Sequence, residues 1–113
     1  KLVEINPELI ILDLSGKELL DEDMKADPDF YKSLDAFKNK KAYYIMPYFT
    51  YGMNFDTALL DMYYMGSLAH PDNYSDVDIA NKAAEIYTVF VGKDVYNDLM
   101  GTYPESFKES NVE

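Results

Sequence analysis

The sequence predicts an α/β fold in which a small parallel sheet is flanked by helices. Two short apolar runs, residues 9–12 and 42–46, are each bounded by proline, glycine or polar turn residues, as is typical of buried strands. Helical patterns lie between these runs and after the second, so we expect the strands to pair in parallel through a right-handed crossover. Because two strands alone make a poor sheet, we expect residues 1–113 to form one partial domain of a larger protein.

Proline, glycine and aspartate mark the ends of the predicted helices. Asp27 followed by Pro28 is a start signal, because aspartate accepts a free N–H group of the first turn and proline fits that turn. Gly92 and Gly101 are expected to end the last two helices, since glycine readily adopts the left-handed conformation. The predicted helices cover residues 17–24, 28–37, 56–69, 79–91 and 94–100, after the end of a first helix at residues 1–5.

Apolar side chains at helical spacing predict which face each helix buries. Phe30, Leu34 and Phe37 recur at i, i+4 and i+7 and indicate one continuous helix. The longest helix shows the same period in a stripe made of Phe55, Ala58, Leu59, Met62, Tyr63, Gly66 and Ala69. Residues 106–113 are polar, and we expect this tail to fray.

The charge balance is strongly acidic, with 21 acidic residues against 10 lysines, no arginine and a net charge of -11. Such a surface repels phosphate groups, which argues against nucleic acid and anionic lipid as partners. No apolar run approaches the roughly 20 residues that a membrane-spanning helix needs. The absence of cysteine excludes disulfides, thiol catalysis and cysteine-bound zinc.

The loop at residues 47–54, which follows the second strand, is the candidate ligand site. It carries Tyr48, Phe49, Tyr51 and Asn54 at the carboxyl end of a strand, where open α/β sheets bind ligands. Aromatic side chains beside a few polar groups are also typical of small-molecule sites. The alternative is that Phe49 and Met53 turn inward and that the tyrosines cap the core.

Asp13 and Ser15 follow the first strand and are expected to lie on the same rim as this loop. A plain turn explains them equally well, because aspartate and serine side chains often bond to the backbone of their own turn. We therefore keep both as candidate ligand-binding residues.

Signatures of catalysis and of metal binding are absent from the sequence. There is no glycine-rich phosphate loop, no nucleophile elbow and no HExxH motif, so we predict that the chain is not an enzyme and needs no cofactor. His70 is the only histidine, and its place before Pro71 indicates a helix cap rather than a metal ligand. Asp76 or Asp78 is expected to cap the following helix.

Four segments together resemble the solute-binding proteins that serve ABC importers of iron complexes and corrinoids. They are INPELIIL at residues 5–12, DFYKSLDAFKNKKAY at 29–43, TALLDMYYMG at 57–66 with His70-Pro71 after it, and VFVGKDVY at 89–96. Each motif is loose alone, but their order along the chain is more specific. The resemblance implies a C-terminal lobe, a partial Rossmann-like α/β domain that would be three-layered in the intact protein, with the ligand bound between two lobes.

The resemblance also implies a function, a location and partners. The chain would capture an iron complex (a siderophore or haem) or a corrinoid and deliver it to the permease subunits of the importer. It would lie outside the cytoplasm, in the periplasm or on a cell-surface lipoprotein, without insertion of this segment into the membrane. The cleft residues of the family map to residues 48–54, and Glu18, Asp21 and Glu22 are candidates for permease contact.

The alternative function is that of a small protein-interaction domain that uses the aromatic loop at residues 48–54 and binds no small molecule. Tyrosine is favoured at protein interfaces as well as in ligand sites. A cleft lined by Tyr48, Tyr51 and Asn54 would favour the importer function. A flat exposed patch formed by the same residues would favour the interaction domain.

Overall fold

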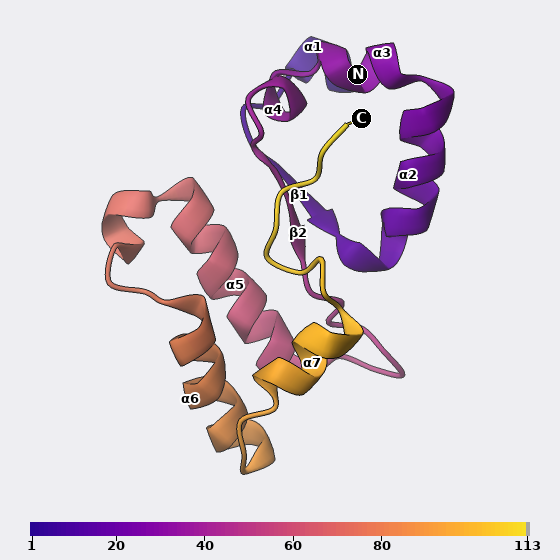
Figure 1. Cartoon of the computed structure of the whole chain (residues 1–113). Coiled ribbons are helices and arrows are strands. Elements are labelled where there is room, and N and C mark those ends of the chain that lie inside the picture. The colour runs from indigo at the N-terminus through magenta and orange to yellow at the C-terminus, as the bar shows by residue number, and fades with distance from the viewer. Residues whose placement is uncertain (113) are drawn as a thin grey trace.

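Helices lie on either side of a two-stranded parallel sheet in the computed structural model, which describes residues 1–112 (Figure 1). β1 (Ile10–Asp13) pairs with β2 (Ala42–Ile45), with Ile10 opposite Ala42 and Asp13 opposite Ile45. The helices are α1 (Leu2–Ile5), α2 (Lys17–Ala26), α3 (Pro28–Ser33), α4 (Asp35–Lys38), α5 (Phe55–Ala69), α6 (Ile79–Val91) and α7 (Tyr96–Thr102), with short 3-10 turns at η1 (Leu14–Gly16) and η2 (Pro71–Tyr74). This arrangement confirms the predicted α/β fold with a small parallel sheet flanked by helices.

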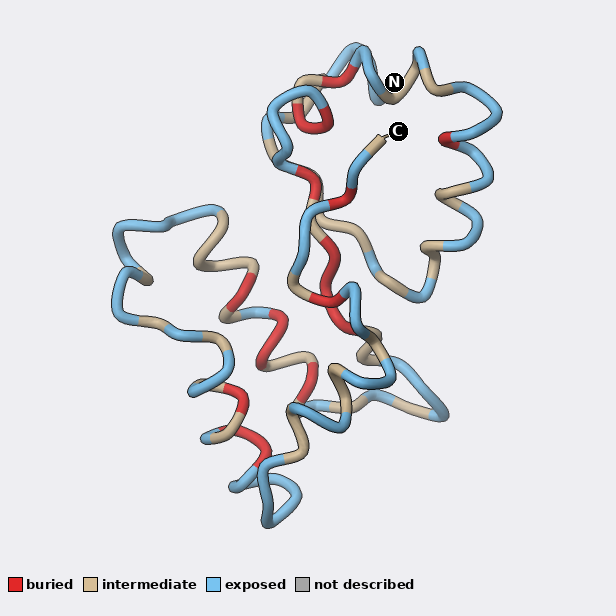
Figure 2. Tube along the Cα trace, in the orientation of Figure 1, coloured by how far each residue is buried: buried red, intermediate tan, exposed pale blue. Residues whose placement is uncertain are grey.

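The apolar side chains form two separate core clusters. Along the backbone, buried positions occur in β2, in α4 and in the pair of helices α5 and α6 (Figure 2). The first joins α2, α4 and β2 through Met24, Leu34, Phe37 and Ala42. The second joins α5 to α6 through Leu60, Ala83, Ile86 and Tyr87, with α7 packed against it. The residues of β2 are more deeply buried than those of β1, whose apolar side chains are half-buried.

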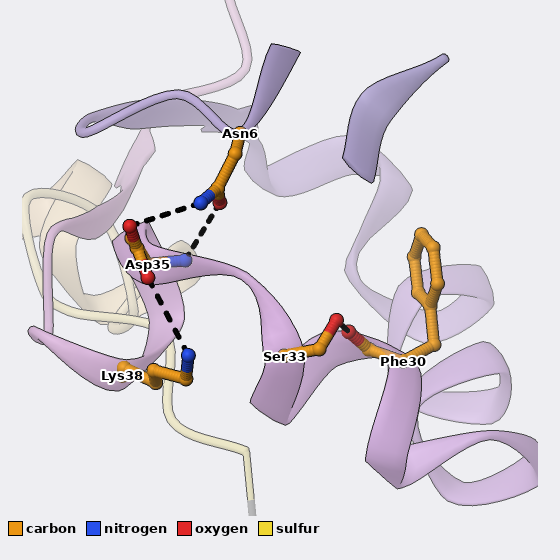
Figure 3. A network of polar contacts seen from close by, with 5 residues as sticks. All are labelled: Asn6, Phe30, Ser33, Asp35 and Lys38. Carbon is orange, nitrogen blue, oxygen red and sulfur yellow. Dashed lines mark hydrogen bonds and ion pairs between the residues drawn. The ribbon is translucent and has the colours of Figure 1, made fainter. Parts of the chain in front are cut away.

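The helix predicted over residues 28–37 is wrong, because the structure breaks it at Leu34. Leu34 adopts an extended backbone conformation (φ -80, ψ 130) and is fully buried, so α3 ends and α4 begins around it. The backbone N–H of Asp35 donates to Asn6 Oδ1 at 3.0 Å, and Asn6 Nδ2 donates to Asp35 Oδ2 at 2.9 Å (Figure 3). Ser33 Oγ closes the end of α3 by donating to the Phe30 carbonyl at 2.6 Å. A contact with a residue 29 positions away therefore satisfies the Asp35 N–H group, which a continuous helix would have paired internally.

The most deeply buried face of α5 is not the one that the apolar stripe predicts, although Leu59 and Tyr63 of the stripe pack against the second core cluster. Phe55 and Met62 belong to the predicted stripe, yet they are 67% and 62% exposed. The buried residues of α5 are Thr57, Leu60, Asp61 and Tyr64. The prediction is therefore only partly right, because α5 carries apolar residues on more than one side and their period did not specify which side meets β2 and α6.

The C-terminal tail is ordered along β2 over residues 106–112, so the prediction that it frays is wrong for these residues (Figure 1). Phe107 N donates to the Tyr44 carbonyl at 2.8 Å, and Tyr44 N donates to the Lys108 carbonyl at 2.9 Å. Ser110 N donates to the Ala42 carbonyl at 2.8 Å, and the Ser110 side chain is buried. The tail thus pairs with backbone groups at the edge of β2 that β1 does not reach.

Most of the predicted helix ends agree with the structure. Asp27 and Asp78 are N-caps whose carboxylates accept backbone N–H groups at 3.2 and 2.8 Å. Gly92 ends α6 with φ 86, and His70 occupies the C-cap position of α5. The prediction for Gly101 is wrong, because α7 continues through it to Thr102. None of the helices within residues 1–112 has both the length and the apolar character needed to cross a membrane.

Candidate functional site

The parallel register brings the carboxyl ends of β1 and β2 to the same edge of the sheet, as the sequence predicts (Figure 1). Asp13, the last residue of β1, lies opposite Ile45, the last residue of β2. Met46 and the loop at residues 47–54 follow directly, and α5 begins at the end of this loop. The edge therefore carries the candidate residues from both strands.

The loop is closed on itself by backbone contacts. Asn54 N donates to the Tyr48 carbonyl at 2.8 Å, and Phe49 and Met53 face each other in an antiparallel bridge. The tip is formed by Tyr51 and Gly52, which both have positive φ angles of 57 and 141. Gly52 adopts such an angle without strain, whereas the left-handed φ of Tyr51 costs about 1–2 kcal/mol.

The loop exposes its apolar side chains to solvent. Phe49 is 70% exposed, Met53 is 49% exposed and Tyr51 is fully exposed at the tip, whereas Tyr48 and Asn54 are half-buried. The alternative in which Phe49 and Met53 turn inward is therefore wrong. Leaving a large apolar side chain in water forgoes about 1.5–3 kcal/mol of burial free energy, so this loop gains stability from any surface that covers it.

Asp13 and Ser15 form a local turn beside this loop. The Asp13 carboxylate accepts the Ser15 N–H at 2.8 Å and caps η1. Both side chains are exposed at the edge of the sheet. Their hydrogen bond is that of a plain turn, which was one of the two explanations given by the sequence. They also lie at the strand ends, where the other explanation places the rim of the ligand site.

Asp61 is a buried carboxyl group at the same edge that the sequence analysis missed. It is 1% exposed, its Oδ1 accepts the Met46 N–H at 3.0 Å, and its Oδ2 has no hydrogen-bond partner among the described residues. Burial raises the pKa of Asp61 to about 7, the hydrogen bond from Met46 lowers it, and the nearby Asp13 carboxylate raises it. The signal that could have identified it is its place between Leu60 and Met62, in the apolar part of the helix beyond the first turn.

A pair of buried hydroxyl groups lies next to Asp61. Thr57 Oγ1 and the Tyr87 hydroxyl are 3.1 Å apart, and the Tyr87 hydroxyl also donates to Met46 Sδ at 3.9 Å. Burial raises the pKa of Tyr87, and its hydrogen bond with Thr57 lowers it. Tyr87 therefore stays protonated at neutral pH and joins α6 to both α5 and the end of β2.

The three residues proposed for permease contact lie on α2, but they differ in their surroundings. Glu18 and Glu22 are exposed, whereas Asp21 is half-buried and forms an ion pair with Lys17. Asp21 and Lys17 also line a hollow of about 460 Å³ between α2 and the C-terminal tail, with Met24, Lys25, Pro28 and Asn111. This hollow includes no residue of the aromatic loop.

Across residues 1–112, no group of three or more histidine and carboxylate side chains comes together to hold a metal ion. No protein-family model matches the chain, and no curated protein matches it either. The resemblance to the solute-binding proteins of ABC importers therefore rests on the four sequence motifs alone.

Proposed function

We propose that the chain is the C-terminal lobe of an extracytoplasmic solute-binding protein, which captures an iron complex or a corrinoid and delivers it to the permease of an ABC importer. The observation that carries the proposal is the exposed aromatic loop at the carboxyl edge of a parallel sheet, the edge at which α/β folds bind ligands. The order of the four motifs supports the same function. The loop would form one wall of the binding cleft, and a second lobe would form the other.

The side chains of the loop suit a rigid, partly apolar ligand. Phe49 and Tyr51 present aromatic faces to solvent, and their rings lose little conformational freedom when a planar ligand covers them. Tyr48 and Asn54 supply polar groups at the base of the loop. With no arginine and a net charge of -11, the chain favours a neutral or cationic complex over a highly anionic siderophore.

Contact with the permease is proposed for the exposed acidic side chains of α2. Glu18 and Glu22 are free to meet basic side chains of a membrane subunit, whereas Asp21 would first have to leave Lys17. We therefore expect charge reversal at Glu18 and Glu22 to reduce transport more than Asp21→Asn does. Binding of the solute itself should not change in any of these variants.

Intrinsic fluorescence of the two-lobed protein tests the ligand, because this chain contributes 11 tyrosines to it. The protein is titrated with haem, a cobalamin, and ferric siderophores of different charge. One of these should quench the fluorescence, and Tyr51→Ala and Phe49→Ala should each weaken that binding at least tenfold. Val3→Ala, which trims another exposed apolar side chain at α1, is the matched control and should bind normally. Absence of binding to every compound would overturn the proposal.

A protein-interaction domain is the second candidate function, and one observation favours it. Tyr51 is fully exposed at the tip of its loop. The hollow lined by Asp21 and Lys17 includes no residue of the loop, so the loop offers an exposed aromatic patch rather than a wall of that hollow. Aromatic side chains of this kind are frequent anchors at protein interfaces. The titration separates the two functions, because an interaction domain would leave the intrinsic fluorescence unchanged with every small molecule.

A further inference from the structure

Asp61 joins the start of the aromatic loop to α5, the helix that follows the loop. The loop leaves β2 at Met46, whose backbone N–H donates to the Asp61 carboxylate, and it enters α5 at Asn54, on the helix that carries Asp61. The Asn54 N–H in turn donates to the Tyr48 carbonyl, which closes the loop above this junction. A change in the bond between Met46 and Asp61 therefore acts on the base of the whole loop.

The groups that face Asp61 disfavour a negative charge on its carboxyl group. Asp13, at the end of β1, contributes a carboxylate of the same sign. Tyr87, from α6, contributes a neutral hydroxyl that is engaged by Thr57 and Met46. The ion pairs within residues 1–112 bring no lysine to Asp61. The Asp61 carboxyl group is removed from water, and within residues 1–112 the Met46 N–H is the single hydrogen-bond donor to it.

We propose that Asp61 is a proton-linked tether of the loop at residues 47–54, and that its ionisation opens the junction between β2 and α5. The tether acts as a positioning device, because Asp61 is buried and does not reach solvent. This proposal rests on the buried junction and its single hydrogen bond, and it does not depend on the proposed importer function. Its consequence for ligand capture, tighter binding in mildly acidic solution than in alkaline solution, rests on the proposed importer function.

The direction of the effect follows from proton linkage. In the closed junction burial holds the pKa of Asp61 near 7, whereas an opened junction lets water reach the carboxyl group and returns its pKa toward 3.8. The closed form therefore binds the proton more tightly, and the ratio of open to closed forms rises as the pH increases from about 4 to about 7. Each unit of difference in pKa changes that ratio about tenfold, so the whole interval spans roughly a thousandfold.

Hydrogen exchange at the Met46 amide tests the tether, because this N–H is the donor in the bond to Asp61. After correction for the intrinsic exchange rate, its protection should fall at least tenfold between pH 5 and pH 8. Asp61→Asn keeps an oxygen acceptor for Met46 but cannot ionise, so its protection should be independent of pH. Asp27→Asn, at an exposed N-cap, is the matched control and should keep the pH dependence of the unmodified chain.

A second variant covers the case in which Asp61→Asn does not fold. Asp13→Asn removes the neighbouring negative charge and retains an oxygen acceptor for Ser15, so the fall in Met46 protection should move to lower pH. Equal pH dependence of Met46 protection in the unmodified chain and in Asp61→Asn would overturn the proposal. So would an unshifted transition in Asp13→Asn. Since no ligand is present, neither result depends on the importer function.

Discussion

Asn6 and Asp35 bind each other through two reciprocal hydrogen bonds, side chain to side chain and side chain to backbone (Figure 3). Asn6 lies at the C-cap of α1 with a left-handed φ of 40, and Asp35 opens α4. The pair therefore holds the start of the chain against the break between α3 and α4. Asparagine suits this position because it tolerates the left-handed conformation and carries both a donor and an acceptor.

Asn6→Ala should lower the free energy of unfolding by about 2–4 kcal/mol. The change leaves the Asp35 N–H without its partner, which costs about 1–3 kcal/mol, and it places alanine in the left-handed region, which costs about 1 kcal/mol more. Asn6→Gly removes the same hydrogen bonds without the conformational cost, so it should be the milder change. Urea denaturation measures both. Equal stability of the two variants would contradict the role assigned to the backbone conformation.

Ser110→Pro should detach the tail from β2. Proline removes the N–H group that donates to the Ala42 carbonyl, and it should lower stability by about 2–3 kcal/mol. Ser110→Ala keeps that bond and loses only the contact of Ser110 Oγ with the Tyr44 hydroxyl, at a cost of about 1 kcal/mol. Thermal unfolding compares the variants. A frayed tail would make both substitutions neutral.

Gly66→Ala should bring α5 into conflict with Tyr74. A Cβ atom at this position would lie 2.6 Å from the Tyr74 hydroxyl oxygen, so the ring would have to move out of its contact with the helix. Alanine favours the helix by about 1 kcal/mol, which partly offsets the lost packing. We expect Gly66→Ala to lower the free energy of unfolding by about 1 kcal/mol in the unmodified chain and to raise it by a similar amount in the Tyr74→Ala variant. A double-mutant cycle by urea denaturation measures this coupling, and additive effects would contradict the contact.

The stability of the chain should depend on pH through Asp61. Its folded-state pKa of about 7 lies above the ordinary value of 3.8, so the folded chain holds the proton more tightly than the unfolded chain does. The contribution of Asp61 is therefore greatest below about pH 4 and is lost as the pH rises through about 7, by about 4 kcal/mol in total. Unfolding of the unmodified chain and of Asp61→Asn is compared from pH 4 to 8. A constant difference between them would contradict this prediction.

Features that depend on a few neighbouring residues could be predicted from the sequence. Asp27 caps α3, and Gly92 ends α6 in the left-handed conformation, because each end requires only groups within about four residues of it. The two strands and their parallel pairing also followed from short apolar runs separated by helical segments. The aromatic loop after β2 was located by the same local reasoning.

The tertiary structure alone decided features that depend on distant partners. The break at Leu34 depends on Asn6, and the pairing of the tail depends on the free edge of β2. The orientation of α5, which buries Asp61 and exposes Met62, depends on β2 and α6 together. A helix that is apolar on several sides carries no local signal for the face that it buries. Which face is buried depends on how the helices and the sheet together reduce their exposed apolar area.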